Sequence, residues 1–322
     1  MKAIVCTAYG TPDVLQLRDV EKPIPKDNEV RVRIRASVVT PADCAFRKAD
    51  PFAVRFVYGF LRPRNAILGV ELSGEVESAG KDVTLFSPGD QVYGVSTRSF
   101  GSHAEYICLP EDAVLTAKPA NMTYEAAAGI CDGALTALVF LRDVAAVRYG
   151  QRVLINGASG AVGAYAVQLA KHMGAEVTGV CSGANAELAA SLGAGDVIDY
   201  TRVDFTKSGR TYDVILDAVG KSSFTRCKGV LKPGGIYLST VPTPALLLRT
   251  LAASLRGRGG RRAKFIAAGL RQNKTNLLYL KALAEAGELR PVIDRRYPLE
   301  QAAEAHRYVE TGRKKGNVVL VP

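Results

Sequence analysis

The sequence feature that most constrains the fold is residues 153–163, VLINGASGAVG. Its aliphatic start is typical of a strand that is buried on both faces of a parallel sheet. A turn of very small residues follows, and AYAVQLAKHMGAE then has the apolar spacing of an amphipathic helix. Such a turn lets the backbone approach a pyrophosphate, and the helix start offers free N–H donors and the positive end of the helix dipole. A tight turn without a ligand has the same pattern, so other parts of the chain must distinguish the two.

The dinucleotide interpretation predicts which residues contact the cofactor. Folds that prefer NAD carry an acid about 20 residues beyond the glycines, at the end of the second strand, where it binds the ribose diol. Here that strand ends at Cys181, Ser182 and Gly183, without a carboxylate that would repel a 2′-phosphate. We therefore predict NADPH, with its adenosine phosphate near Ser182, Asn185 and Tyr200; for Ser182, capping of the next helix is the alternative. The predicted pyrophosphate-binding residues are Gly157, Ala158, Ser159, Gly160, Ala161, Val162 and Gly163.

Length and composition indicate a globular protein of about two domains, since the chain has 322 residues, 48% of them apolar and 23% charged. The N-terminal MKAIVCTAYG lacks a long apolar segment, and no run of 18 or more uncharged apolar residues occurs. We therefore expect a cytoplasmic protein. The six cysteines lack C-x-x-C spacing, so we expect reduced thiols and neither a zinc ribbon nor a disulfide framework.

The sequence pattern changes along the chain. The first 120 residues contain short alternating runs such as EVRVRIRASVV between Gly, Pro and Asp, which is typical of an antiparallel β domain. Beyond the glycine turn, EVTGVCS, DVIDY, YDVILDAVG and GIYLSTV are strands separated by helices or loops, which predicts a doubly wound parallel sheet. The tail then has RPVIDRRYPL, a helix EQAAEAHRYVETG and a strand NVVLVP, which could return to the first domain.

The formal net charge of +11 is unevenly distributed. From Ala218 to Ala284 the chain has many Lys and Arg residues and no Asp or Glu. A solvated basic surface explains this as well as an anionic cofactor, a membrane surface or a nucleic acid does.

The longest motifs resemble one family over nearly the whole chain. The matching stretches are ILGVELSGEVESAGKDVTLFSPGDQVYG, FGSHAEYICLP, KPANMTYEAAAG, GALTAL, GQRVLINGASGAVGAYAVQLAK, SLGAGDVIDY and KGNVVL. They resemble the medium-chain dehydrogenase/reductase superfamily, and within it the zinc-independent quinone oxidoreductase branch related to zeta-crystallin. The resemblance implies an α/β fold, with a GroES-like β-rich catalytic domain at 1–122 and 288–322 and a Rossmann NADPH-binding domain at 123–287. One departure is Ala161, where the branch usually has Gly.

The resemblance also indicates which residues of this chain occupy the positions of the zinc ligands in zinc-dependent relatives. Zinc-dependent relatives place Cys, His and Cys at positions that correspond here to Thr40, Val70 and roughly Asp132. Thr and Val are not zinc ligands, and the nearby Cys44 and Cys131 have no histidine beside them in the sequence. We therefore predict no metal site, and regard the three histidines as structural.

Without zinc the chain lacks the Lewis acid that ionises an alcohol, so we predict hydride transfer from NADPH to quinones or α,β-unsaturated carbonyls. The family comparison makes Thr40 a candidate catalytic donor, although the branch commonly has Asn there, and Asn317 in KGNVVL a cofactor contact. Thr136 in GALTAL is a candidate pocket hydroxyl, with a bond to its own helix backbone as the alternative. The competing function is a non-catalytic, nucleotide-gated protein that binds RNA or an anionic membrane through its basic half.

Two further segments have open interpretations. The aromatics of residues 46–65, Phe46 and Tyr58 among them, could line a substrate pocket, pack the loop onto the β domain, or bind single-stranded nucleic acid. Of these interpretations we favour nucleic-acid binding least. Residues 243–265, TPALLLRTLAASLRGRGGRRAKF, resemble an interfacial helix with a basic end. We favour a contact in a homodimer, or a segment that covers the cleft, over a peripheral membrane contact there.

Overall fold

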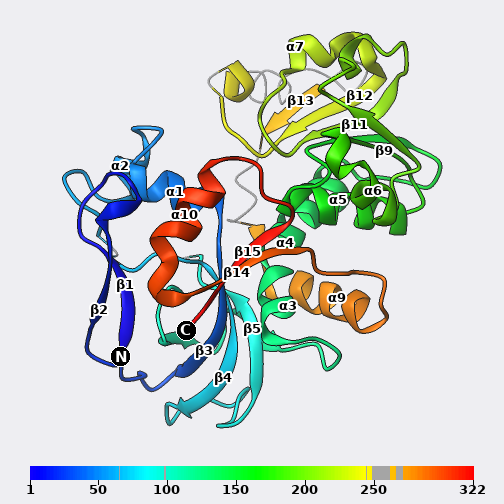
Figure 1. Ribbon diagram of the computed structural model, residues 1–322. Helices are drawn as coiled ribbons and strands as arrows, with labels where there is room; N and C mark the ends of the chain where they lie inside the picture. Colours follow the sequence, from blue (N-terminus) through cyan, green and yellow to red (C-terminus); the bar gives the residue numbers. More distant parts are fainter. Residues whose placement is uncertain (65, 98, 244, 249–261, 266–270) are drawn as a thin grey trace. The chain divides into compact units, whose positions relative to one another are not determined.

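The computed structural model describes residues 1–322 except 65, 98, 244, 249–261 and 266–270 (Figure 1). The chain forms two compact units. The first comprises Met1–Asp132 and Asn273–Pro322, and the second comprises Gly133–Gln272. The discontinuous first domain with an inserted second domain therefore has the predicted arrangement, but with different boundaries.

The first unit is built on a seven-stranded sheet. Its order is β14-β15-β3-β4-β5-β7, with β6 paired to β3. All of its pairings are antiparallel except that of β14 with β15. The strands are β3 (Glu29–Val39), β4 (Glu71–Ala79), β5 (Gln91–Val95), β6 (Tyr106–Pro110), β7 (Val114–Ala117), β14 (Ile293–Pro298) and β15 (Asn317–Val321); β1 (Lys2–Cys6) and β2 (Leu15–Asp19) form a separate ribbon.

Alternation along β3 produces the core of this sheet. Val30, Val32 and Ile34 are buried, whereas the arginines between them are at least partly exposed. The period of two read from EVRVRIRA is therefore confirmed, because successive side chains of a strand point to opposite faces. The predicted return of the tail is also confirmed, since Val318 of β15 pairs with Val39 of β3.

Helices of the first unit explain the shift in its boundaries. The phenol of Tyr93 donates to the carbonyl of Leu277 on α9 at 3.1 Å, and the amide of Asn121 donates to Ala284 at 3.0 Å. Ala128 of α3 packs with Val319. Both helices therefore belong to the first unit, and the predicted boundaries at 122/123 and 287/288 are corrected to 132/133 and 272/273. The helices of this unit are α1 (Pro41–Lys48), α2 (Val54–Tyr58), α3 (Tyr124–Gly129), α9 (Lys274–Glu285) and α10 (Ala302–Glu310).

The second unit is a six-stranded, wholly parallel sheet of order β10-β9-β8-β11-β12-β13. The chain runs outward from β8 in one direction through β9 and β10, then returns to the other side of β8 for β11, β12 and β13. That reversal makes the carboxyl end of β8 the topological switch point, where doubly wound sheets bind ligands. Its strands are β8 (Arg152–Asn156), β9 (Glu176–Cys181), β10 (Asp196–Asp199), β11 (Tyr212–Asp217), β12 (Leu231–Ser239) and β13 (Arg262–Phe265). Its helices include α4 (Asp132–Leu138, whose first residue belongs to the first unit), α5 (Ala161–His172), α6 (Ala186–Ser191) and α7 (Phe224–Cys227).

One helical stretch, Tyr124–Val144, is long and apolar enough to cross a membrane by length and composition alone. Of its most apolar window, 78% is buried inside the protein. Core helices of globular proteins have this composition, so the stretch is explained by packing.

Candidate functional site

The glycine turn follows β8 and leads into α5, as predicted. Gly157 has a φ of +87°, and a Cβ there would stand 2.5 Å from Val219 Cγ1. A Cβ on Gly163 would stand 2.0 Å from the carbonyl oxygen of Gly157. The first glycine therefore permits the turn, and the last permits the close approach of helix to turn.

Gly160 differs from those two glycines, because the protein's own packing leaves room beside it. Among the described residues a Cβ built there would meet only Gly157 O, at 3.4 Å, and the backbone has an ordinary φ of −80°. The N–H groups of Ala161, Val162 and Gly163 precede the first helical hydrogen bond, from Ala164 N to Gly160 O, so they lack an intrahelical acceptor. Open space next to free N–H donors fits a nucleotide pyrophosphate.

Asp217 organises the neighbouring edge of the sheet, and sequence reasoning missed it. It ends β11 and is fully buried. One carboxylate oxygen accepts from Asn156 Nδ2 at 2.9 Å and the other from the phenol of Tyr237 at 2.9 Å. The same carboxylate accepts from the N–H groups of Val219 and Gly220. It thereby holds the loop whose Val219 abuts the glycine turn; the signal in the sequence was a carboxylate at the end of a buried strand.

The predicted adenosine-side residues lie together. Asn185 donates through Nδ2 to Ser159 Oγ at 3.0 Å, so it is tied to the glycine turn. Its Oδ1 is buried without a partner in the described part of the chain. Ser182 precedes a short 3-10 turn, Gly183–Asn185, but its side chain makes no capping hydrogen bond. The capping alternative for Ser182 therefore finds no support, and Asn185 Oδ1 is an acceptor that a bound nucleotide could satisfy.

A carboxylate also lies here, contributed by the neighbouring strand. Asp199 ends β10 and pairs with Cys181 of β9. Hydrogen bonds from the N–H and hydroxyl of Thr201, and one from the N–H of Gly183, lower the pKa of Asp199. Tyr200 follows it, 62% exposed. The expectation that no carboxylate lies at the end of β9 is thus corrected, because the adjacent strand β10 brings Asp199 beside that end.

In the first unit, Thr40 caps α1. Its hydroxyl donates to Asp43 Oδ2 at 2.6 Å and accepts from the N–H of Asp43 at 3.1 Å, forming a capping box. The other oxygen of Asp43 accepts from the N–H of Gly69 at 3.1 Å. The proton of Thr40 is therefore already used, and the hydroxyl could serve a developing oxyanion only by leaving Asp43.

The positions of the zinc ligands in relatives do not have the donor chemistry of a zinc site. Thr40 and Val70 offer no imidazole or thiolate, and Cys131 is fully buried with its pKa raised by burial. Burial also raises the pKa of Cys44 to about 12. Among the described residues no group of three or more His, Cys, Asp or Glu side chains could hold a metal ion.

Two of the three histidines, His103 and His306, lie together in the core of the first unit. His306 Nδ1 lies 3.5 Å from Cys44 Sγ, so a histidine does accompany that cysteine in space. The ring of His103 contacts that of His306 with centroids 5.8 Å apart. Both rings are fully buried, and burial lowers the pKa of His306 well below its usual value. The two rings pack as core side chains, and burial disfavours the charged form of His306.

A buried acid and a desolvated lysine lie in this unit and were not predicted. Glu71, at the start of β4, is 1% exposed and accepts from the N–H of Asp132 at 2.9 Å. Burial and then the charge of Asp132 raise its pKa. Burial lowers the pKa of Lys314 to about 8, against the attraction of Glu71 and Asp294. Its ammonium donates to Gly316 O at 2.5 Å. Lys314 could therefore release a proton near neutral pH, whereas Glu71 holds its proton more tightly than an ordinary carboxyl group does.

Two predicted contacts occupy buried positions. Asn317 is 1% exposed, and its Nδ2 donates to Gly129 O at 2.9 Å and to Val292 O at 3.2 Å. It therefore ties β15 to the end of α3. Thr136 lies on α4 at 8% exposure, and the structure records no bond from its hydroxyl to another described residue. The alternative of a backbone bond for Thr136 is thus not seen.

The predicted pocket aromatics pack inside the first unit. The rings of Phe46, Tyr58 and Phe100 contact one another, with centroids 4.9–5.2 Å apart. Tyr58 is 3% exposed and belongs to a core cluster with Ile4. Packing, one of the three interpretations of this segment, is the role that the structure gives to Phe46 and Tyr58.

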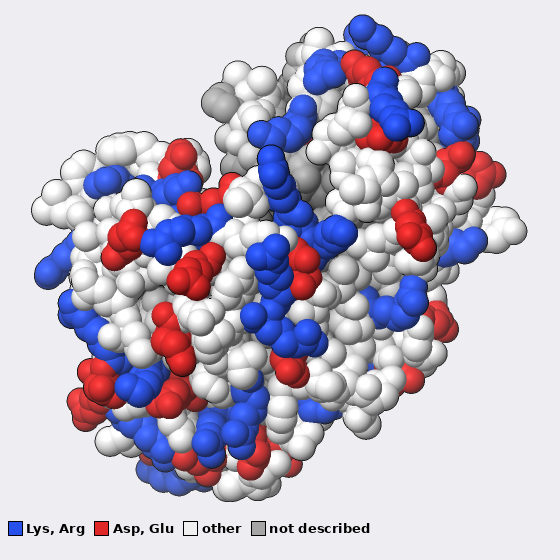
Figure 2. Space-filling model, in the orientation of Figure 1, with Lys and Arg blue, Asp and Glu red and all other residues white. Residues whose placement is uncertain are grey.

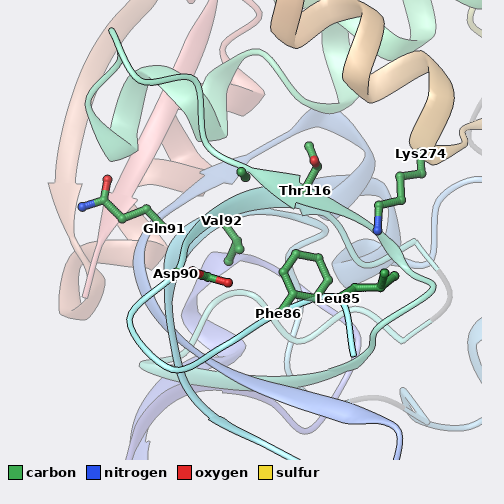
Figure 3. A pocket seen from close by; sticks show the side chains of 8 residues that line it. Leu85, Phe86, Asp90, Gln91, Val92, Thr116 and Lys274 are labelled. Atoms are coloured by element: carbon green, nitrogen blue, oxygen red, sulfur yellow. The ribbon is translucent and has the colours of Figure 1, made fainter. Parts of the chain in front are cut away.

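A cavity of about 360 Å³ lies elsewhere in the first unit (Figure 3). Phe86 and Val92 supply apolar surface, and Lys274 reaches in from the start of α9, with its ammonium 4.9 Å from the Phe86 ring centre. None of the predicted site residues lines it. The cavity is therefore separate from the predicted cofactor-binding residues and from the predicted catalytic and substrate-pocket residues.

The basic stretch from Ala218 to Ala284 is partly neutralised by acidic side chains that lie close to it in the folded chain. Arg226 pairs with Asp204 at 3.1 Å and Lys232 with Asp213 at 2.7 Å, both acids coming from earlier in the chain. On the face in Figure 2, acidic side chains lie among the basic ones. Most of residues 243–265, for which we predicted a dimer or cleft-covering role, lies outside the described residues. The unbroken basic run in the sequence thus overstates the local charge.

Comparisons with known proteins agree with this arrangement. Residues 26–120 match the alcohol dehydrogenase GroES-like domain, and residues 192–320 match a family described as zinc-binding dehydrogenase. The chain is 34% identical to the NAD(P)H oxidoreductase RTN4IP1, mitochondrial, of Bos taurus, over 99% of this chain and 89% of that protein. It is 30% identical to the NADPH-dependent alkenal/one oxidoreductase, chloroplastic, of Arabidopsis thaliana, over 100% of this chain and 80% of that protein.

A solved structure shows the same fold. The quinone oxidoreductase from Coxiella burnetii superposes with a TM-score of 0.89 at 31% identity, covering 100% of this chain and 99% of that one. The GroES-like and Rossmann-like domains predicted from the motifs are thereby confirmed. The chain belongs to the medium-chain dehydrogenase/reductase superfamily, and within it is an NAD(P)H-dependent oxidoreductase of the quinone oxidoreductase type.

Proposed function

We propose that this protein is an NADPH-dependent reductase of quinones or α,β-unsaturated carbonyls that works without zinc. The observation that carries the proposal is the turn at Gly160, where open space adjoins three N–H groups without intrahelical acceptors. When bound, NADPH supplies hydride to an electron-poor acceptor. Two of the relatives reported above, the alkenal/one oxidoreductase and the quinone oxidoreductase, are named for these acceptor classes, which supports the choice.

The 2′-phosphate is assigned to Ser182, Asn185 and Tyr200. The hydroxyl of Ser182 makes no capping bond and is available to donate. Asp199 opposes a second negative charge, but Arg202 lies 3.8 Å from its carboxylate and offsets that repulsion. NADPH is therefore favoured only modestly over NADH by this arrangement.

Activity without zinc is supported by all the side chains at and near the ligand positions together, and not by any single residue. Thr40 and Val70 offer no imidazole or thiolate at the ligand positions, and burial raises the pKa of the nearby Cys44 and Cys131 thiols. A zinc-dependent alcohol dehydrogenase uses its metal to stabilise the alkoxide, whereas reduction of an enone or quinone needs a proton for the oxygen or carbon that becomes negative.

We assign the supply of that proton to Lys314, whose pKa burial lowers to about 8. Lys314 lies close enough to Glu71 for the two side chains to interact electrostatically, in the same unit as Thr40 and Asp43. Glu71 is anchored by the N–H of Asp132 at 2.9 Å, so its position is defined. Positioned acids with pKa values near the working pH transfer protons most efficiently.

The test is oxidation of NADPH, followed by absorbance, with ortho-quinones, para-quinones, 2-alkenals and alkenones, and with alcohols plus NADP as control. Turnover of quinones or enones but not of alcohols, unchanged after chelation, is expected. Stoichiometric zinc that is lost together with activity would overturn the zinc-free part. Absence of turnover across the panel, together with RNA or vesicle binding of steep salt dependence, would replace the enzyme by a binding protein.

A further inference from the structure

An exposed apolar tip on the first unit is not explained by the proposed reaction. It consists of Phe52, Phe56, Phe60 and Leu61, which we call the aromatic tip. Their exposed fractions are 59%, 67%, 57% and 83%. Three rings exposed to this degree present on the order of 300 Å² of apolar surface in one place, which single scattered side chains do not. Such a patch marks an interaction surface.

The aromatic tip is preorganised. The three rings contact one another with centroids 5.9–6.2 Å apart. Arg55 lies beneath them, with its guanidinium 4.6 Å from the ring of Tyr9 and 5.6 Å from that of Phe52, and it donates to Phe60 O at 3.0 Å. Tyr9 in turn donates to Gly59 O. The rings are therefore held exposed by their supports, and are not the loose end of a loop.

The charge in the segment that carries the aromatic tip is mostly positive. Asp50 is the sole acid between residues 46 and 64. Lys48 is paired with Glu310 at 2.9 Å, and the buried Arg47 bonds the same carboxylate. Arg62 and Arg64 are exposed, and the structure records no ion pair between either and a described residue. In Figure 2 the surface over α1 and α2 is mostly white, with basic and a few acidic side chains among it.

We propose that the aromatic tip docks this protein on bilayers that carry anionic headgroups, with the rings entering the interface and Arg62 and Arg64 binding lipid phosphates. Exposed aromatic side chains next to arginines match the two layers of a bilayer surface, apolar below and anionic above. Charge complementarity thus identifies the occupant. The proposal is independent of the hydride acceptor.

A single-stranded nucleic acid is the other anionic candidate, and the ring geometry disfavours it. Phe52 meets Phe56 and Phe60 at interplanar angles of 83° and 86°. Bases bind by stacking on open ring faces, and edge-to-face rings about 6 Å apart leave no slot between them for a base. Leu61, the most exposed member, offers no stacking face at all.

The chain contains no tryptophan, so Phe56→Trp places a single reporter at the aromatic tip. Its emission is measured with vesicles of phosphatidylcholine alone, vesicles of phosphatidylcholine and phosphatidylglycerol, brominated lipids, and single-stranded RNA. We expect a blue shift with the anionic vesicles and quenching by brominated lipid. Unchanged emission with vesicles overturns the proposal, and a shift with RNA alone assigns the aromatic tip to nucleic acid.

Vesicle flotation of the full chain tests the residues. Phe52→Ser, Phe56→Ser and Phe60→Ser together should lower the bound fraction at least about tenfold, whereas Ile24→Ser, at a position 77% exposed in the same unit, should not. Arg62→Gln with Arg64→Gln should weaken binding to anionic vesicles more than Arg18→Gln with Arg33→Gln, which removes the same charge elsewhere. Equal effects of the two arginine pairs, or wild-type binding by the triple variant, would contradict docking through the aromatic tip. Thermal unfolding of each variant verifies that it is folded.

Discussion

Asp199 lies against Gly183, so close that a Cβ on Gly183 would stand 2.6 Å from Asp199 Oδ2. The two residues are 16 positions apart in sequence, and adjacent parallel strands bring them together. A carboxylate therefore borders the place where an adenosine ribose and its 2′-phosphate are expected.

This contact predicts how cofactor preference responds to Asp199→Asn. Removal of the charge should raise the affinity for NADPH relative to NADH by about threefold to tenfold, because a dianionic phosphate no longer faces a carboxylate. Fluorescence titration with both cofactors measures the ratio. Asp196→Asn on the same strand, where Asp196 pairs with Arg210 at 2.7 Å, is the control and should leave it unchanged. A ratio unaffected by Asp199→Asn would remove Asp199 from the site.

The glycine turn predicts opposite outcomes at two positions. Gly160→Val should abolish cofactor binding with little change in the free energy of unfolding, since the protein leaves room for that side chain and the ligand does not. Gly163→Ala should destabilise the fold by about 1–3 kcal/mol, because its Cβ would collide with Gly157 O. Denaturant unfolding and cofactor titration separate the two effects. If Gly160→Val binds NADPH normally, the pyrophosphate lies elsewhere.

Lys314 predicts a pH dependence. Its pKa of about 8 means that the ammonium is present below that pH and lost as the pH rises through it. If Lys314 supplies the proton, kcat should fall above about pH 8. Lys314→Met should lower kcat at neutral pH and abolish this alkaline limb, while Lys315→Met, at an exposed neighbour, should retain it. If kcat of Lys314→Met still falls above about pH 8, another group supplies the proton.

Thr40 predicts a stability change that distinguishes capping from catalysis. Thr40→Val removes the hydroxyl that bonds Asp43, and should cost about 1 kcal/mol of stability, whereas Thr40→Ser keeps it. A role in catalysis would add a loss of kcat in Thr40→Val at unchanged KM. Unaltered kcat in a folded Thr40→Val would leave Thr40 with a structural role alone.

The sequence by itself determined the features that depend on neighbours along the chain. The glycine turn at 157–163, the alternation of β3 and the succession of parallel strands follow from local spacing, because backbone geometry imposes periods of two and 3.6 on side-chain directions. The resemblance of the motifs to a known family added the prediction that the N-terminal and C-terminal segments form one discontinuous domain. Ser182 and Asn185 could be predicted as cofactor contacts because they lie in the loop that follows a strand end.

Only the tertiary structure decided what depends on contacts between distant segments. Asp199 reaches Gly183 across two strands, and Glu71 is desolvated by elements far from it in sequence. Of the aromatics in residues 46–65, Phe46 and Tyr58 are packed into the core while Phe52, Phe56 and Phe60 are exposed. All five have the same side-chain chemistry apart from one hydroxyl. Burial and electrostatic environment are properties of the whole packed unit, so residue type and spacing alone cannot supply them.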